Sequence, residues 1–323
     1  MIRDEDLPAL ALDRHDAGAR VALAWVVETW GSAPRAAGSL LVIDGDGRME
    51  GSVSGGCVEG AVMVEAMDAL EDGKPRLLDF GVSDEDAFAV GLACGGRIRV
   101  LVDPLGGSLP VDLLRDLVAA RAARRPVAYV ADLESGARRL ATPPEFADRF
   151  RLDRSGVEED GRSFVALQNP PLRMLIVGAV HIAQPLVGMA RACGFDPVLI
   201  DPSGAFGSED RFPGETILDD WPDAALVALA PDARTAVVTL THDPKLDDPA
   251  ITATLGSDAF YLGCLGSTRT HAKRVARLTE AGFSDSQIAR IHAPVGLEIG
   301  GRKPAEIAVS IMAQVIATLR KPA

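Results

Sequence analysis

The chain has 323 residues, of which 47% are hydrophobic and 24% are charged, a composition typical of a globular protein. Its formal net charge of −13 disfavours binding to nucleic acid or to anionic membranes, because both need clustered lysine and arginine side chains. The N-terminal MIRDEDLPAL lacks a signal-peptide pattern, no apolar run is long enough to span a bilayer, and the four cysteines lack a disulfide-framework spacing. We therefore expect a cytoplasmic protein.

The first half of the chain mixes predicted helices and strands. Residues 5–17 have a helical pattern, and residues 20–30 form an apolar run typical of a buried strand. Two apolar runs around DGDG predict a β-hairpin over residues 40–54, and a mostly apolar helix follows from Val58 to Leu70. The remaining predicted elements are a strand at 97–105, an amphipathic helix at 110–126 and a hairpin at 127–142.

The second half predicts alternating strands and helices. Residues 173–201 have the pattern strand, tight turn, helix, strand, which is a βαβ unit, and such alternation predicts a parallel sheet covered on both faces. We therefore predict an α/β protein with a mixed α/β domain at residues 1–168, followed by a Rossmann-like parallel-sheet domain at residues 169–323. The other predicted elements here are strands at 235–241 and 259–267 and helices at 267–283 and 304–319.

The first turn of the βαβ unit partly matches the dinucleotide-binding fingerprint G-x-G-x-x-G/A. Gly178, Ala183 and the acidic Asp201 at the end of the second strand all fit the pattern, and His181 lies within the turn. Val180 replaces the middle glycine, which normally lets the backbone approach the pyrophosphate. The pattern predicts the fold, and it leaves open whether the domain binds NAD(P), in this or another pose, or no dinucleotide.

Polar loops follow the later strands and the segment before the last predicted helix. Ligands bind at the carboxyl ends of the strands in such sheets, and helix N-termini attract anions. A solvated surface is the alternative for the arginines, and His242 is either an acid–base group or a hydrogen-bonded loop residue. The candidate ligand-binding residues of these loops are Thr241, His242, Asp243, Gly266, Ser267 and Arg302.

A cysteine flanked by glycines lies in the stretch GSVSGGCVEGAV. Cys57 follows Gly55 and Gly56, which permit positive φ angles and a close approach of ligand to backbone. The predicted helix begins just after the cysteine, and a helix N-terminus stabilises a thiolate. Glu59, two residues further on, can accept or donate a proton. Cys57 is therefore a candidate functional thiol.

A second cysteine, Cys94, precedes Gly95 and Gly96 directly before a predicted strand. Soft thiolates serve in ligation of a metal or metal cofactor, in sulfur transfer and in redox disulfides, and the sequence leaves these three uses open. Cys193, in a helical run, and Cys264, in a strand, are instead expected to be buried packing residues.

Longer motifs resemble a known family. GSAPRAAGSLLV, GSVSGGCVE and CGGRIRVLVDP are similar to the N-terminal domain of the xanthine dehydrogenase accessory family (XdhC/CoxI). The C-terminal Rossmann domain of the same family resembles VGAVHIAQPLVGMARACGFDPVLID, THDPKLDDPA, LGSTRTHAKR and IHAPVGLEIGGRKPAEIA. The resemblance extends over nearly the whole chain and is least distinctive at residues 106–168.

The resemblance implies a maturation factor rather than a free-standing enzyme. Such proteins bind the molybdenum cofactor, as molybdopterin or in a nucleotide-extended form, and pass its sulfurated form to an apo molybdenum hydroxylase. They work with a cysteine desulfurase and commonly form homodimers. An NAD(P)-dependent oxidoreductase and a thiol redox protein with a Cys57–Cys94 disulfide are the alternatives.

The resemblance also directs the choice of candidate residues. In the second domain, Gly178, His181, Asp201 and the loop residues named above are expected to contact the cofactor. Cys57 and Cys94 are expected to lie near the molybdenum as its ligands. The cofactor-binding residues predicted for the first domain are Arg35, Ser54, Gly55, Gly56, Cys57, Glu59, Cys94, Gly95 and Gly96.

Overall fold

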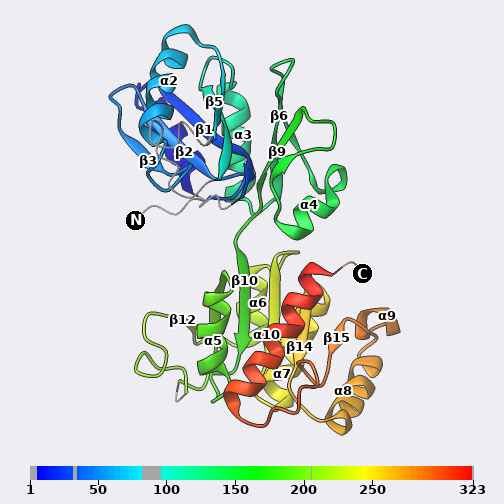
Figure 1. Ribbon diagram of the computed structural model, residues 1–323. Helices are drawn as coiled ribbons and strands as arrows, with labels where there is room; N and C mark the ends of the chain where they lie inside the picture. The colour runs from blue at the N-terminus through cyan, green and yellow to red at the C-terminus, as the bar shows by residue number, and fades with distance from the viewer. Residues whose placement is uncertain (1–5, 32–34, 82–95, 205, 322–323) are drawn as a thin grey trace. The chain divides into compact units, whose positions relative to one another are not determined.

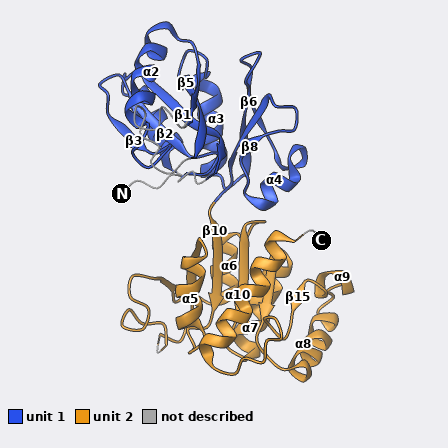
Figure 2. Cartoon of the chain, viewed as in Figure 1, with its two compact units in different colours: residues 1–170 blue, residues 171–323 orange. Residues whose placement is uncertain are grey.

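The computed structural model describes residues 6–31, 35–81, 96–204 and 206–321 (Figure 1). The chain forms two compact units, unit 1 (Met1–Pro170) and unit 2 (Pro171–Ala323), which meet in the double proline (Figure 2). Two of the candidate site residues, Cys94 and Gly95, lie outside the described residues.

Unit 1 contains a five-stranded antiparallel sheet in the order β3 (Met49–Gly51), β2 (Leu40–Asp44), β1 (Val21–Trp30), β5 (Arg97–Pro104) and β4 (Arg76–Phe80). Most of β1 is apolar and buried because both faces of the sheet are covered. The helix α2 (Glu59–Asp72) packs on one face, and α1 (Leu7–Asp16) and α3 (Val111–Ala122) pack on the other.

A smaller antiparallel sheet completes unit 1. Its strands are, in order, β7 (Arg138–Ala141), β6 (Val127–Asp132), β9 (Ser163–Gln168) and β8 (Gly156–Val157). Tyr129, Ala131, Phe164 and Ala166 on one face of this sheet join the same core as α1 and α3. The 3₁₀ turn η2 (Pro143–Glu145) and the short helix α4 (Ala147–Leu152) connect β7 to β8, and Phe150 of α4 packs on the outer face.

Unit 2 is a six-stranded parallel sheet in the order β12 (Thr216–Leu218), β11 (Phe195–Ile200), β10 (Leu172–Val177), β13 (Thr235–Thr239), β14 (Tyr261–Cys264) and β15 (Ile291–His292). Numbered along the unit, this order is 3-2-1-4-5-6, which defines the Rossmann fold. The first three strands are added toward one edge of the sheet and the last three toward the other, so the strand order switches between the neighbours β10 and β13. Ligands of such folds bind outside the carboxyl ends of the strands at this switch point.

Helices cover both faces of the parallel sheet (Figure 1). One face packs against α5 (Ala183–Ala192) and α10 (Pro304–Arg320), the other against α6 (Pro222–Leu229), α7 (Pro244–Leu255), α8 (Thr268–Glu280) and α9 (Asp285–Ile288). Across the described ranges, no helix is both long and apolar enough to cross a bilayer.

The predicted elements are confirmed within a few residues at their ends, and so is the fold class. No prediction located the strands β4, β8, β9, β12 and β15 or the helices α4, α6, α7 and α9. Several of these strands are only two or three residues long and lack a measurable alternation. Burial was also wrong for one cysteine, because Cys193 follows the last residue of α5 and its side chain is exposed, whereas Cys264 is fully buried as predicted.

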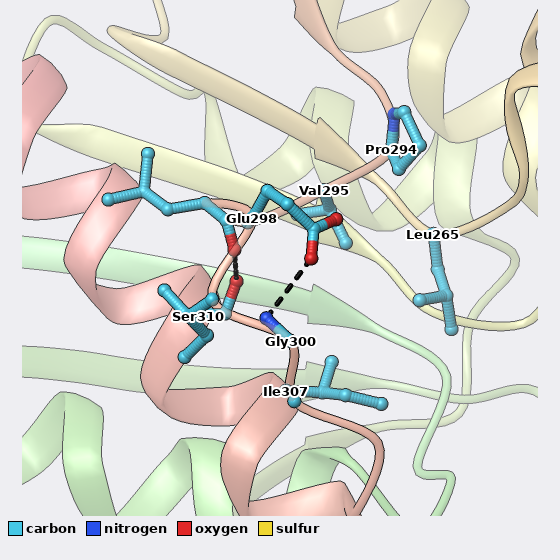
Figure 3. Close-up of a pocket in the computed structure, with 11 residues that line it drawn as sticks. Leu265, Pro294, Val295, Glu298, Gly300, Ile307 and Ser310 are labelled. Carbon is cyan, nitrogen blue, oxygen red and sulfur yellow. Dashed lines mark hydrogen bonds between the residues drawn. The ribbon is translucent and has the colours of Figure 1, made fainter.

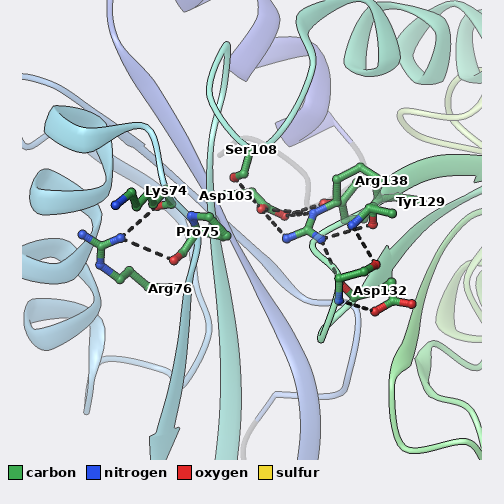
Figure 4. Close-up of polar contacts among 10 residues, drawn as sticks. Lys74, Pro75, Arg76, Asp103, Ser108, Tyr129, Asp132 and Arg138 are labelled. Atoms are coloured by element: carbon green, nitrogen blue, oxygen red, sulfur yellow. Dashed lines mark hydrogen bonds and ion pairs between the residues drawn. The ribbon is translucent and has the colours of Figure 1, made fainter.

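A buried ionic cluster links the two sheets of unit 1 (Figure 4). The guanidinium of Arg138, on β7, donates to the carboxylate of Asp103, on β5, with an Nη2–Oδ1 distance of 2.8 Å. The hydroxyls of Tyr129 and Ser108 donate to the same carboxylate. The side chains of Asp103 and Arg138 are 0% and 2% exposed, so each charge depends on the other for compensation.

Replacing Arg138 with Met is expected to lower the free energy of unfolding by about 3–5 kcal/mol, because Asp103 would stay buried without its counter-charge. The matched control is Arg139→Met, which removes a solvent-exposed ion pair with Glu145 and should cost about 1 kcal/mol or less. Urea unfolding followed by circular dichroism measures both values. Equal losses in the two variants would contradict the importance of the buried pair.

Candidate functional site

The loop 52–58, between β3 and α2, is organised around the carboxylate of Glu59. This carboxylate belongs to the first residue of α2, and its two oxygens accept hydrogen bonds from both serine hydroxyls and from the backbone of the loop. Oε1 accepts from the Ser52 hydroxyl (2.7 Å), the Val53 N–H (3.2 Å) and the Ser54 N–H (2.9 Å). Oε2 accepts from the Ser54 hydroxyl, the Gly56 N–H (2.9 Å) and the Val58 N–H (3.2 Å).

The serine hydroxyls accept hydrogen bonds from the backbone N–H groups of the loop that do not donate to Glu59. Ser52 Oγ accepts from Gly55 at 2.8 Å, and Ser54 Oγ accepts from Cys57 at 2.9 Å. Every backbone N–H from residue 53 to residue 58 therefore has an acceptor inside the loop. These hydrogen bonds restrain the loop and leave none of the backbone N–H groups of residues 53–58 free for a bound anion.

The electrostatics of Glu59 follow from these contacts. Burial by itself would raise the pKa of this carboxyl group, but the hydrogen bonds from Ser54 and Ser52 outweigh burial and lower the pKa to about 2. The group is therefore ionised at neutral pH and lies at the N-terminal end of α2, where a negative charge is favoured. This arrangement argues against the proton-exchange role that the sequence left open.

The thiol of Cys57 is the exposed chemical group of this loop. Gly55 and Gly56 have φ angles of 80° and 112°, in the region that favours glycine. A Cβ atom on Gly56 would meet nothing within 4 Å, so backbone conformation rather than space requires the glycine. The two glycines turn the chain so that the side chain of Cys57 is exposed to solvent.

The other candidate residues of unit 1 are less informative. Gly96 is buried directly before β5, and Arg35 is half-buried. Within the described part of the chain, no group of three or more histidine, cysteine, aspartate or glutamate side chains could hold a metal ion. Because Cys94 lies outside that part, its distance from Cys57 stays a matter of prediction.

In unit 2, the turn after β10 is shaped by neighbouring protein groups. Gly178 has a φ of 99°, and a Cβ atom there would lie 2.5 Å from the methyl group of Thr241. Val180 and Ile182 pack against the hydrophobic core, whereas His181 is exposed. The glycine is thus required by the backbone angle and by the closeness of Thr241, without any contribution from a pyrophosphate.

The carboxylate of Asp201 accepts hydrogen bonds from the same turn and from Ser203. Its Oδ2 accepts the Ala179 N–H at 2.7 Å, and its Oδ1 accepts the N–H and hydroxyl of Ser203. The residue is 5% exposed. In dinucleotide-binding domains an acidic residue at this place accepts a ribose hydroxyl, and both oxygens of Asp201 already have donors. Arg211 adds a further contact to this turn by donating to the carbonyl of Ala179 at 2.9 Å.

The loop residues after β13 and β14 mainly cap helices. Asp243 caps α7 by accepting the Lys245 N–H at 2.9 Å, and Ser267 caps α8 by accepting the Thr270 N–H at 3.2 Å. His242 is exposed and has a φ of 62°, which is unusual for a residue other than glycine. The remaining candidates in these loops are Gly266, with a φ of 142°, and the exposed Arg302 before α10.

A buried charge pair beneath these loops was missed by the sequence analysis. Asp247, on α7, and Arg274, on α8, are 1% and 2% exposed, and their nearest charged atoms lie 3.7 Å apart. Thr241 donates to Asp247 at 2.6 Å, and Arg274 donates to the carbonyl of Leu265 at 3.3 Å. Burial raises the pKa of Asp247 more than Thr241 and Arg274 lower it.

A sequence signal for this pair existed. The buried residues of α8 are Arg274 and Leu278, four positions apart on one helical face. A charged residue on the buried face of an amphipathic helix indicates a buried partner or a structural anchor. The anchor here is the Leu265 carbonyl, which fixes the loop between β14 and α8.

The fold and these loops define a Rossmann domain preceded by a mixed α/β domain. Comparisons with known proteins identify the family. The family model described as the XdhC Rossmann domain matches residues 174–315, and that of the XdhC and CoxI family matches residues 15–81. The chain is 31% identical over 298 residues to the molybdenum cofactor insertion chaperone PaoD of Escherichia coli, covering 92% of this chain and 83% of the relative.

Two further relatives cover almost the full chain. A protein of Bacillus subtilis described as a probable xanthine dehydrogenase component is 28% identical over 336 residues, covering 98% of this chain and 97% of the relative. A crystal structure described as a xanthine dehydrogenase from Bacillus halodurans is similar with a TM-score of 0.63 at 25% identity, covering 99% and 96%. The chain belongs to the XdhC and CoxI family, which confirms the resemblance seen in its motifs.

Replacing Glu59 with Gln is expected to lower the free energy of unfolding at pH 7 by about 1–3 kcal/mol, since buried donors lose a charged acceptor. The folded pKa of about 2 lies below the ordinary value of 4.5, so the carboxylate stabilises the fold fully above pH 4.5. That contribution is lost as the pH falls through about 2. Urea unfolding at several pH values measures the difference, with exposed Glu71→Gln as control. A difference between wild type and Glu59→Gln that does not depend on pH would contradict this role.

Neither the wild type nor Val180→Gly is expected to bind NADH saturably. The variant removes the β-branched side chain from the turn, yet the donors to Asp201 and the contact of Arg211 with Ala179 stay in place. Fluorescence titration with NADH measures the affinity. Micromolar binding by Val180→Gly would show that the middle glycine alone was missing.

Proposed function

We propose that this protein is a molybdenum-cofactor-binding chaperone. It stabilises the cofactor, supports its sulfuration and inserts it into an apo molybdenum hydroxylase of the xanthine dehydrogenase or CO dehydrogenase type. Family membership and the similarity to a molybdenum cofactor insertion chaperone support the cofactor and the class of client. In this role the protein is an accessory factor, and the cofactor is its cargo.

The observation that carries the proposal is that the exposed Cys57 lies on a loop held by hydrogen bonds to Glu59 and Ser54. Cysteine thiolates are soft ligands that suit a thiophilic metal centre. A ligand on a loop whose backbone donors are all satisfied loses little conformational freedom on binding, and this preorganisation increases affinity. The loop 52–58 therefore suits a protein that must hold a metal cofactor and later release it to another protein.

Other parts of the proposal rest on the family alone. Cys94 joins Cys57 as a ligand of the molybdenum, Arg35 supplies positive charge near the anionic cofactor, and a cysteine desulfurase provides the sulfur. The protein acts as a homodimer in the cytoplasm. The cofactor is molybdopterin, with or without a nucleotide extension.

An NAD(P)-dependent oxidoreductase is the alternative function, favoured by the strand order of unit 2. The contacts of Asp201 weigh against it, because the carboxylate that would recognise the ribose and the Ala179 N–H of the glycine turn are already paired with each other. The chaperone function needs neither group to be free.

The wild-type protein is expected to take up molybdenum and pterin in near-equal amounts when it is incubated anaerobically with cofactor released from a molybdenum enzyme. Cys57→Ser should reduce retention several-fold, because a hydroxyl is a poor ligand for a thiophilic metal. The matched control is Cys193→Ser, which changes the other exposed cysteine of the described chain and should retain the cofactor. Metal analysis and pterin fluorescence after gel filtration measure both components.

Two results would contradict the proposal in different ways. Equal retention of the cofactor by the two variants would show that Cys57 does not contribute to cofactor binding. Absence of uptake by folded wild-type protein would reject the chaperone function itself.

A further inference from the structure

Unit 2 contains a cavity of about 270 Å³ beside the start of α10 (Figure 3). Leu265, Val295 and Ile307 supply apolar walls, and the other residues of the loop 294–301 complete the lining together with Ser310. The cavity lies after β14 and β15, at the carboxyl edge of the parallel sheet, where ligands bind in this fold.

The walls of this cavity are held in place by hydrogen bonds to the side chains of Arg274, Gln314 and the lining residue Ser310. Arg274 donates to the carbonyl of Leu265, and Gln314 accepts the Gly296 N–H at 2.8 Å. Ser310 donates to the carbonyl of Leu297. Gly296 has a φ of 92°, and a Cβ atom there would lie 2.3 Å from Ser310 Oγ. These contacts fix the positions of Leu265, Gly296 and Leu297 in the cavity wall.

Its size selects a class of ligand. Pockets that enclose a drug-sized molecule measure about 300–1,000 Å³, so the cavity suits one flat ring system and is too small for a whole dinucleotide. The aliphatic walls favour the faces of a heteroaromatic ring.

The charged side chain in the cavity lining is Glu298, and Ser310 adds a hydroxyl group (Figure 3). One carboxylate oxygen, Oε1, accepts the Gly300 N–H at 3.0 Å, and among the described residues no hydrogen bond to Oε2 is found. A carboxylate pairs best with two parallel N–H donors. A 2-amino-4-oxopyrimidine ring carries such donors side by side, on its ring nitrogen and on its amino group. Adenine lacks this edge.

Positive charge follows directly after the cavity wall. Arg302 and Lys303 succeed Gly300 and Gly301 and are both exposed. Their backbone N–H groups donate to Glu306, at 2.8 Å and 3.0 Å, so their side chains are what remains for an anion. A ring in the cavity would thus find a hydrogen-bond acceptor at Glu298, and a phosphate on its substituent would find positive charge in the residues that follow the cavity wall.

We propose that this cavity binds a 2-amino-4-oxopyrimidine ring, with Glu298 accepting hydrogen bonds from its amino edge and Arg302 and Lys303 facing its phosphate. The ring has two sources, the pterin of the molybdenum cofactor or the guanine of a nucleotide extension. The inference rests on the proposed function, because that function supplies a ligand with this chemistry.

The test is equilibrium binding of three probes to the full chain: pterin-6-carboxylate, GMP and AMP. Pterin-6-carboxylate or GMP should bind saturably and AMP at least about tenfold more weakly. Glu298→Gln should weaken binding about tenfold, the effect of one charge-assisted interaction. Ile307→Trp should abolish binding by filling the cavity.

Matched controls separate local from general effects. Val309→Trp places the same side chain on the exposed face of α10, two residues further on, and Glu280→Gln removes a carboxylate at the end of α8. Neither should change binding. The tighter of the two ring ligands identifies the source of the ring.

Binding of AMP as tight as GMP, absence of binding to wild type, or unchanged binding in Glu298→Gln and Ile307→Trp would each overturn the inference. These outcomes are distinct from failure of the proposed function. A protein that takes up molybdenum cofactor but ignores these probes retains its function and loses only this site. A protein that takes up no cofactor loses the function whatever the probes do.

Discussion

Backbone groups in loops must be satisfied without the partners that helices and sheets provide, and this constraint shapes each loop described above. Glu59 accepts hydrogen bonds from backbone N–H groups of the loop 52–58, and Asp201 accepts one from the turn after β10. Arg274 and Gln314 do the same for the segments around Leu265 and Gly296. Polar and ionisable side chains thus act as internal anchors that restrain these loops through hydrogen bonds.

Some polar side chains therefore serve to hold the loops, and only the others are available to bind a ligand. Glu59, Ser54 and Asp201 have the residue types of a binding site, yet their oxygens are occupied by the protein itself. What these anchors leave available is the exposed thiol of Cys57 in unit 1 and the walled cavity with Glu298 in unit 2. A cofactor chaperone benefits from such an arrangement, since it must bind its cargo through few contacts and then release it.

Much of the architecture was predictable. The apolar run at residues 20–30, the DGDG turn and the βαβ pattern at residues 173–201 predict elements that the structure confirms. Local periodicity reports these elements because their burial is continuous along the chain. The short strands β8, β12 and β15 escaped prediction, since two or three residues carry no period and pair only where neighbours already exist.

By itself the sequence determined the Rossmann domain, the family and the glycine turn around Cys57, because each depends on residues close together in the chain. The tertiary structure decided which polar groups are free. Asp247 and Arg274 are 27 positions apart (274 − 247), and Asp103 and Arg138 are 35 apart, so their pairing is invisible to a local pattern. The cavity likewise joins Leu265 to Ile307. Packing alone brings such residues together, and so packing decides where a ligand can bind.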